Sequence, residues 1–212
     1  MSESPAAQLA RIAAQLQSSG LNAGTSGNVS IRVTDGLLVT PSAVPPELMT
    51  AEVMVELTDD GKLRSAGVPT SEWRIHAAIY GTLPAAGAVV HTHSTYATAL
   101  ASLREDLPAF HYQVAKAGGH LIACAQYAPF GSPELSDAVI TALGNRRVCL
   151  MANHGMIAYA PTLDAAFALA LEVETLCQQY LIARSVGQPY ILSAEQMDDV
   201  LERFAQYGKP VS

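Results

Sequence analysis

The most informative spacing in the sequence is a histidine pair, His91 and His93, at the end of the apolar run Val89-Val90. Side chains two residues apart along a strand project from the same face, so two imidazoles could bind one metal ion there. Two hydrogen-bonded histidines at the end of a strand would produce the same pattern. The pair by itself therefore indicates metal chemistry without establishing it.

Other residues could complete such a site. His154 lies where two strands are expected to meet and can supply a third nitrogen. Three imidazoles joined by a carboxylate form a ligand set that suits zinc. Glu72 and His76 lie four residues apart on a helix expected over Ser71–Tyr80, so they share one face, and either could be the fourth group. Taken alone, Glu72 is more typical of a solvated acid at the start of a helix.

A turn rich in small residues, Gly24-Thr25-Ser26-Gly27-Asn28, could bind an anion. It can present backbone N–H groups together with hydroxyl and amide donors. The turn has neither the lysine of a P-loop nor a G-x-G-x-x-G pattern, so nucleotide binding is not supported. Ser42 adds a hydroxyl, and Thr70-Ser71 adds two more at the positive end of a helix dipole. For each segment alone, an ordinary turn or helix cap is the alternative interpretation.

Local signals predict the elements that must position these residues. Ser-Pro pairs are expected to open helices at residues 4 and 132, and Ser193-Ala-Glu-Gln196 is a capping box. Helices are expected over 4–20, from 71, from 94, over 132–144, 162–187 and 193–208. Strands are expected near 29–33, 37–40, 54–58, 89–93, 121–125, 147–153 and 156–160. Without repeats or linkers, these elements predict a single domain, residues 1–212, with one sheet between helices.

The composition excludes several classes of protein. Half of the 212 residues are hydrophobic, only 15% are charged, and the net charge is −7. No cluster of basic residues interleaves with aromatics, so nucleic-acid binding is not expected. The longest apolar stretch, over 162–187, is interrupted by charges, which argues against a membrane span. Three cysteines without a C-x-x-C pair support neither disulfides nor a thiolate zinc site.

The same features bear on location and assembly. The N-terminal residues lack the basic and apolar regions of a secretory signal, so a cytoplasmic location is expected. A chain this apolar also predicts that sister subunits cover part of its surface.

The sequence contains six ordered segments: GLNAGTSGNVSIR, VTPSAVP, PTSEWRIHAAIY, VVHTHSTYATALAS, FHYQVAKAGG and NHGMIAYAPTLDAAFALALEVE. In this order they resemble the class II aldolase and adducin family, from Gly20 to Gly208. The resemblance implies an α/β fold with three layers, α/β/α, around a mainly antiparallel central sheet. It implies a homotetramer with active sites at subunit boundaries. It also implies one Zn²⁺ per site, with the ligands His91, His93, His154 and Glu72.

The resemblance further assigns roles in a reaction. Glu72 would move the proton, and His76 would be structural. Tyr112, from the neighbouring subunit, and Tyr207, from the C-terminal segment, would complete the catalytic set. The substrate phosphate would be bound by Thr25, Gly27, Asn28, Ser42, Ala43, Thr70 and Ser71. The implied reaction is reversible cleavage of a ketose 1-phosphate into dihydroxyacetone phosphate and a small aldehyde.

Departures from the family pattern and related activities leave alternatives open. Ser42-Ala43 stands where the pattern has Thr-Gly, and Thr70-Ser71 where it has Ser-Ser, which leaves the substrate's identity open. Ribulose-phosphate 4-epimerases of the family carry aspartate in place of Glu72. Methylthioribulose-phosphate dehydratases share the three histidines and the acid, and are disfavoured by FHYQVAKAGG and Tyr207. An adducin-like scaffolding module would not need metal ligands.

Overall fold

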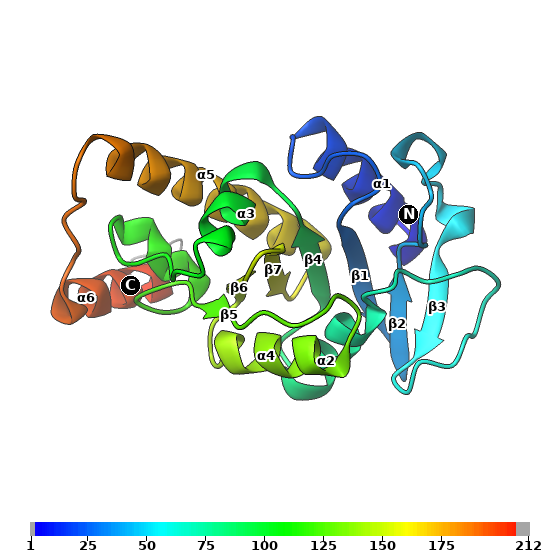
Figure 1. Ribbon diagram of the computed structural model, residues 1–212. Coiled ribbons are helices and arrows are strands. Elements are labelled where there is room, and N and C mark those ends of the chain that lie inside the picture. The colour runs from blue at the N-terminus through cyan, green and yellow to red at the C-terminus, as the bar shows by residue number, and fades with distance from the viewer. Residues whose placement is uncertain (1–2, 207–212) are drawn as a thin grey trace.

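A seven-stranded sheet forms the centre of the computed structural model, which describes residues 3–206 (Figure 1). The strand order is β3-β2-β1-β4-β7-β6-β5. All neighbouring strands pair antiparallel except β5 and β6, which confirms the prediction of a mainly antiparallel sheet. The strands are β1 (Asn28–Val33), β2 (Gly36–Val39), β3 (Val55–Thr58), β4 (Ala88–Thr92), β5 (Cys124–Ala125), β6 (Val148–Met151) and β7 (Gly155–Ala160).

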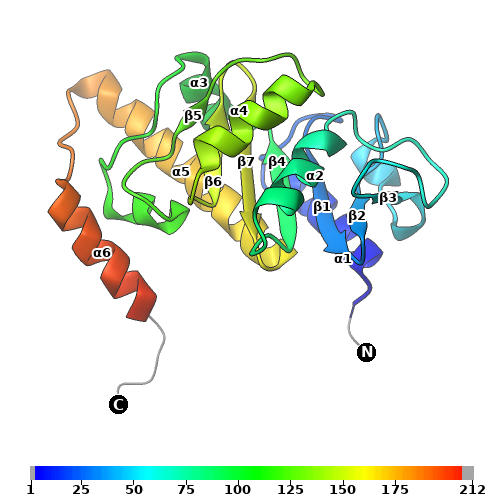
Figure 2. The same cartoon turned by 90° about the horizontal axis from the view of Figure 1, so that it is seen from below.

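Helices cover both faces of this sheet and complete three layers. Helices α1, α3 and α5 lie on one face, and α2 and α4 lie on the other (Figures 1 and 2). A separate group of buried apolar side chains fills each of the two interfaces. The predicted α/β/α architecture is thereby confirmed. The helices are α1 (Pro5–Ser18), α2 (Trp73–Thr82), α3 (Thr95–Ser102), α4 (Pro133–Leu143), α5 (Leu163–Val186) and α6 (Ala194–Gln206).

The helix ends show why local signals were informative. The Ser132 hydroxyl accepts a hydrogen bond from the Leu135 N–H at 3.2 Å, directly before Pro133 opens α4. At the start of α6, the Ser193 N–H donates to Gln196 Oε1 at 2.8 Å, and the Gln196 N–H donates to the Ser193 hydroxyl at 3.2 Å. These reciprocal bonds satisfy helix-end N–H groups that would otherwise lack partners.

Several predicted boundaries differ from the observed ones, and two of the differences have a clear structural reason. Helix α2 begins at Trp73 instead of Ser71, because Glu72 has φ −101° and ψ 11°, which lies outside the regular helix. The strand expected over 121–125 is reduced to β5, because Ile122 pairs back onto Leu107 in an isolated bridge. Sequence reasoning also missed three 3₁₀ helices, η1 (Pro46–Leu48), η2 (Ala51–Val53) and η3 (Tyr112–Ala117).

Over residues 3–206, no helix has the length and apolar character needed to cross a membrane. The single domain over 1–212 stays a prediction, and Tyr207 lies outside the described residues.

Candidate metal centre and catalytic pocket

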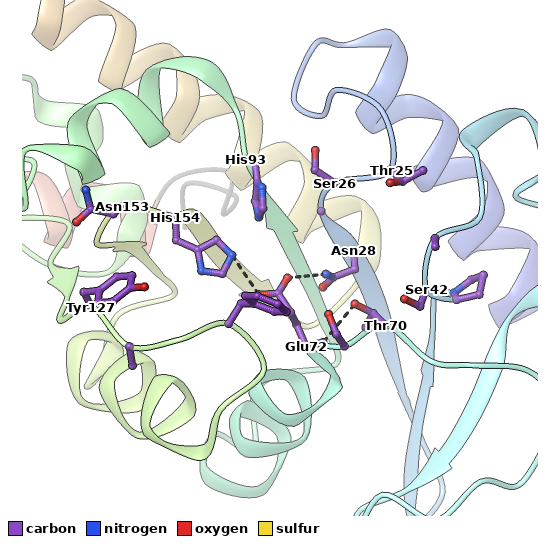
Figure 3. Close-up of a pocket in the computed structure, with 16 residues that line it drawn as sticks. Thr25, Ser26, Asn28, Ser42, Thr70, Glu72, His93, Tyr127, Asn153 and His154 are labelled. Atoms are coloured by element: carbon purple, nitrogen blue, oxygen red, sulfur yellow. Dashed lines mark hydrogen bonds and ion pairs between the residues drawn. The ribbon is translucent and has the colours of Figure 1, made fainter.

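A cavity of about 440 Å³ lies at one end of the central strands (Figure 3). The predicted phosphate residues line one side of it, and Glu72, His93 and His154 line the other. His91 lies behind them and is fully buried. The structure therefore brings the two predicted groups together in one pocket. Its lining comprises Thr25, Ser26, Gly27, Asn28, Pro41, Ser42, Ala43, Thr70, Ser71, Glu72, His93, Tyr127, Ala128, Phe130, Asn153 and His154.

Four potential metal ligands converge beside this cavity. Nε2 of His91 lies 3.1 Å from Glu72 Oε2, and Nε2 of His154 lies 3.1 Å from Glu72 Oε1. The Nε2 atoms of His91 and His93 are 3.0 Å apart. All four ligand atoms lie within 4.8 Å of one another. A cluster of three nitrogens and one carboxylate at these separations is able to bind a metal ion.

The pairing of β4 with β7 sets the geometry of this cluster. Thr92 lies opposite Met156 in the ladder, and the Met156 carbonyl accepts a hydrogen bond from His91 Nδ1 at 2.8 Å. That bond places the Nδ1 proton away from the site and leaves Nε2 facing the other ligands. A Cβ on Gly155 would lie only 2.2 Å from the Thr92 carbonyl oxygen. Glycine is therefore required for the turn that carries His154 to approach β4 so closely.

The start of α3, directly after the histidine pair, is held by an acid that sequence reasoning did not assign. Ser94 or Thr95 was expected to cap this helix, but the Ser94 side chain makes no capping bond. Instead, Glu174 on α5 accepts hydrogen bonds from the N–H groups of Tyr96 and Ala97, both at 2.8 Å, and from the Ser94 hydroxyl at 2.7 Å. Because Glu174 is 80 residues from Ser94, no local pattern could reveal the contact.

Replacing Glu174 by glutamine is expected to lower the free energy of unfolding by about 1–3 kcal/mol, because the charge is lost and only one of the two acceptor oxygens remains for the helix N–H groups. The metal content should fall as well, since His93 directly precedes the loosened helix start. Denaturant unfolding and metal analysis would measure both effects. Glu172→Gln on the same helix, where the acid pairs with Lys116 near the surface, is the matched control. Equal stability of the two variants would show that the Glu174 carboxylate does not hold this junction.

Burial and neighbouring charges both shift the pKa values of the groups in this cluster. Burial raises the pKa of Glu72, but the charges on His91 and His154 outweigh it, so the net shift is downward. Burial and the positive charge on His91 lower the pKa of His93 to about 4. Among the described residues, Glu72 Oε1 is buried without a hydrogen-bond partner. Its contact with His154 is close enough for an ion pair but lacks hydrogen-bond geometry. A metal ion would satisfy this oxygen and the facing imidazole nitrogens, so the residues present fit a metal site.

The turn on the phosphate side is tied to the same cluster. Gly27 has φ +74°, and a Cβ there would lie 2.3 Å from the Asn22 side-chain nitrogen. The Asn22 side-chain oxygen in turn accepts a hydrogen bond of 3.4 Å from the His93 N–H. Ala43 has φ 55°, a left-handed conformation that glycine adopts without strain. This conformation accounts for the glycine that the family pattern has at that position.

The aromatic residues divide into two groups. Tyr112 does not line the cavity of its own chain; it lies at the start of η3, is 48% exposed, and its ring stacks on Phe204 of α6 with centroids 6.2 Å apart. Tyr127 and Phe130 line the mouth of the cavity and are 59% and 72% exposed. Sequence reasoning gave Tyr127 no role, because a single aromatic in a loop carries no spacing signal.

The class II aldolase and adducin N-terminal domain family matches residues 7–181. The chain belongs to this family. The 5-methylthioribulose-1-phosphate/5-deoxyribulose-1-phosphate aldolase of Rhodospirillum rubrum is 46% identical over 196 residues, which cover 92% of this chain and 89% of the relative. The L-fuculose phosphate aldolase of Escherichia coli K12 is also 46% identical, over 89% of this chain and 88% of the relative.

A solved structure of an L-fuculose 1-phosphate aldolase superposes with a TM-score of 0.93 at 35% identity, covering 97% of this chain and 98% of that one. The predicted class II aldolase fold is confirmed by this likeness, and the expectation of a lyase is supported by the aldolase relatives. The roles of individual site residues in this class II aldolase family member stay predictions.

Proposed function

We propose that the chain is a zinc-dependent aldolase that reversibly cleaves a ketose 1-phosphate into dihydroxyacetone phosphate and a small aldehyde. The observation that carries this proposal is that one cavity has the His₃Glu cluster at one side and small, hydroxyl-rich segments at the other. One side suits the reacting carbonyl, and the other suits a phosphate. Relatives named as aldolases of sugar phosphates support the same reaction.

His91, His93, His154 and Glu72 would hold the metal. Imidazole nitrogens with one carboxylate oxygen form a donor set that suits Zn²⁺. When bound, zinc would polarise the substrate carbonyl and stabilise the negative charge that develops beside it. Because the Met156 carbonyl accepts a hydrogen bond from Nδ1, Nε2 is the His91 nitrogen that would give its lone pair to the metal.

Glu72 is the proposed acid-base residue. Asn28 donates a hydrogen bond to its Oε2 at 3.0 Å, whereas Oε1 has no hydrogen-bond partner among the described residues. The carboxylate would remove the proton from the carbon next to the carbonyl, or return it after cleavage. Tyr112 of a neighbouring chain would exchange a proton with the aldehyde oxygen, and Tyr207 would complete the site.

The substrate phosphate would be held by the segments around the turn. Gly27 and Ala43, which could offer backbone N–H groups, line the cavity together with Thr25, Ser42 and Thr70, which carry hydroxyls. Figure 3 shows the side chains of these three hydroxyl residues on the same side of the site. Asn28 and Ser71 complete the proposed set. No lysine or arginine lines the cavity within residues 3–206, so the anion would rely on dipoles and hydroxyls.

The identity of the aldehyde is the finer part of this proposal. Two relatives share the same sequence identity with this chain, 46%: the methylthioribulose/deoxyribulose-phosphate aldolase and the fuculose-phosphate aldolase. Sequence identity therefore does not favour the substrate of one over that of the other. Tyr127 and Phe130 at the cavity mouth favour a small aldehyde with an apolar end. We also propose a homotetramer with shared sites, because Tyr112 lies outside the cavity of its own chain. A cytoplasmic location is part of the same proposal.

Removing the metal is expected to abolish cleavage, and adding Zn²⁺ back is expected to restore it. Metal analysis should find about one zinc per chain. Cleavage of 5-deoxyribulose, 5-methylthioribulose and fuculose 1-phosphates would be followed by the release of dihydroxyacetone phosphate. Loss of water without cleavage would indicate a dehydratase. Full activity of the metal-free protein would contradict the proposal.

A further inference from the structure

His76 takes no part in the chemistry proposed above, yet it is buried in contact with a residue that lines the cavity. The side chain is fully buried on α2. Both ring nitrogens have partners on β1, since Nδ1 lies 2.7 Å from Ser30 Oγ and Nε2 lies 2.6 Å from Asn28 Oδ1. The ring therefore connects two polar residues of the same strand, and one of these, Asn28, lines the cavity.

The contacts continue in both directions. Ser30 Oγ lies 2.7 Å from the Tyr80 hydroxyl, and Asn28 Nδ2 donates to Glu72 Oε2 at 3.0 Å. A continuous chain of hydrogen bonds thus runs from Tyr80 to the Glu72 carboxylate. Its members are buried, with exposed fractions between 0% and 6%.

Helix and strand geometry explains why these residues meet in register. Glu72, His76 and Tyr80 are spaced by four along α2, which gives a rise of about 6 Å per step on one helix face. Asn28 and Ser30 are two apart on β1, which gives about 6.6 Å on one face of the sheet. The two repeats nearly match, so each strand side chain fits between two helix side chains.

The Glu72 carboxylate fixes which group donates and which accepts in each of these hydrogen bonds. An ionised Glu72 can only accept hydrogen bonds, so Asn28 must turn its NH₂ group toward Glu72 and its oxygen toward His76. His76 Nε2 must then carry a proton. Burial and the positive charge on His91 lower the pKa of His76 to about 3, so the ring is neutral and Nδ1 is bare. Nδ1 accepts from the Ser30 hydroxyl, whose oxygen accepts from the Tyr80 O–H.

We propose that His76 is a positioning residue whose Nε2–H holds the Asn28 amide in the one orientation that keeps the Glu72 carboxylate directed at the histidine cluster. This inference depends on the proposed role of Glu72 as the acid-base residue. With the amide reversed, Asn28 Oδ1 would face Glu72 Oε2 across a 3.0 Å contact. Repulsion between these two oxygens would turn the carboxylate away.

The same arrangement limits what Asn28 can give to a substrate. Its oxygen is occupied by His76 and one of its two N–H groups by Glu72. At most one N–H remains for a phosphate. Losing the correct amide orientation should therefore affect proton transfer more than phosphate binding.

Two substitutions of His76 separate positioning from packing. A glutamine amide reaches as far as the imidazole Nε2 and can still donate to Asn28, whereas an asparagine amide reaches only to the position of Nδ1. We expect His76→Asn to lower kcat for exchange of the donor proton of dihydroxyacetone phosphate with solvent by about 10- to 100-fold. KM should change by less than about threefold, because the other phosphate donors remain.

His76→Gln should recover most of the lost kcat. Equal kcat in the two zinc-loaded variants would overturn the inference.

A second pair of variants tests the series of hydrogen bonds at Ser30. Ser30→Ala removes the hydroxyl that donates to Nδ1, so the Nε2–H tautomer loses the hydrogen bond that stabilises its bare nitrogen. Its kcat should fall, whereas Ser136→Ala, which also removes a buried hydroxyl but on α4, should keep the wild-type value. Equal kcat in the serine variants would contradict the inference.

The wild-type protein offers a direct readout that does not depend on activity. Nitrogen-15 NMR of the histidines, with zinc removed, should show His76 as the neutral Nε2–H tautomer at neutral pH and at every lower pH that stays well above its pKa of about 3. Observation of the Nδ1–H tautomer would reverse the assigned direction and overturn the inference. A wild-type protein that neither cleaves ketose 1-phosphates nor exchanges the triose-phosphate proton would contradict the proposed function instead, whatever the tautomer.

Discussion

Replacing Glu72 by glutamine is expected to lower the rate of donor-proton exchange, and of ketose-phosphate cleavage, by about 10²- to 10⁴-fold. Glutamine has nearly the same shape, and its oxygen can still accept the hydrogen bond from Asn28 that the carboxylate accepts at 3.0 Å. What it loses is the capacity to take up a proton. The three imidazoles remain, so zinc should still be found in the purified variant.

The measurement is the exchange of the triose-phosphate proton with deuterated water, with the metal content determined on the same sample. Glu56→Gln is the matched control, since Glu56 is an acid on β3 that contacts Arg64 at 3.5 Å and does not line the cavity. The control should exchange at the wild-type rate. Wild-type exchange in a zinc-loaded Glu72→Gln variant would assign the base to another residue.

Mixing two inactive variants is expected to restore activity if the sites are shared between chains. In the proposed arrangement each site takes Glu72 from one chain and Tyr112 from the next. Glu72→Gln and Tyr112→Phe should each be strongly impaired alone, because every site then lacks one group. Random co-assembly of equal amounts makes an intact site at roughly a quarter of positions, and activity should recover to about that fraction of wild type.

The rate of ketose-phosphate cleavage by co-expressed variants should be compared with that of the same proteins mixed without subunit exchange. Only the co-expressed sample should recover. If verified hetero-oligomers are no more active than the better parent, Tyr112 acts within its own chain or has no role. The exposed position of Tyr112, stacked on Phe204 away from the cavity, favours recovery.

Sequence patterns that involve residues close together in the chain predicted much of this structure. The capping box at Ser193 appears as a reciprocal pair of hydrogen bonds, and the alternation of apolar residues located most of the strands. The spacing of His91 and His93 predicted that both imidazoles would face one side, and their Nε2 atoms are 3.0 Å apart. In each case the relevant partners lie within a few residues of one another.

Features that depend on tertiary contacts were not accessible in this way. Glu72 was more typical of a solvated acid at a helix start, but packing of α2 against β1 leaves it only 6% exposed. The cap from Glu174 and the connection from His76 to Asn28 also join distant segments. Propensities describe the preference of a residue for its own backbone, and they contain no information about which distant side chain will meet it.

The pairing of β4 with β7 also has a consequence for the order in which the protein folds. The His91 ring and the Met156 carbonyl that orients it are 65 residues apart in the chain, and His154 reaches the cluster only through that pairing. Closing a loop of this length costs chain entropy before any contact compensates for it. The complete ligand set therefore requires this long-range pairing, so before the sheet closes His91 and His93 are the only imidazoles of the set that local structure brings together, and full metal affinity depends on closure of the sheet.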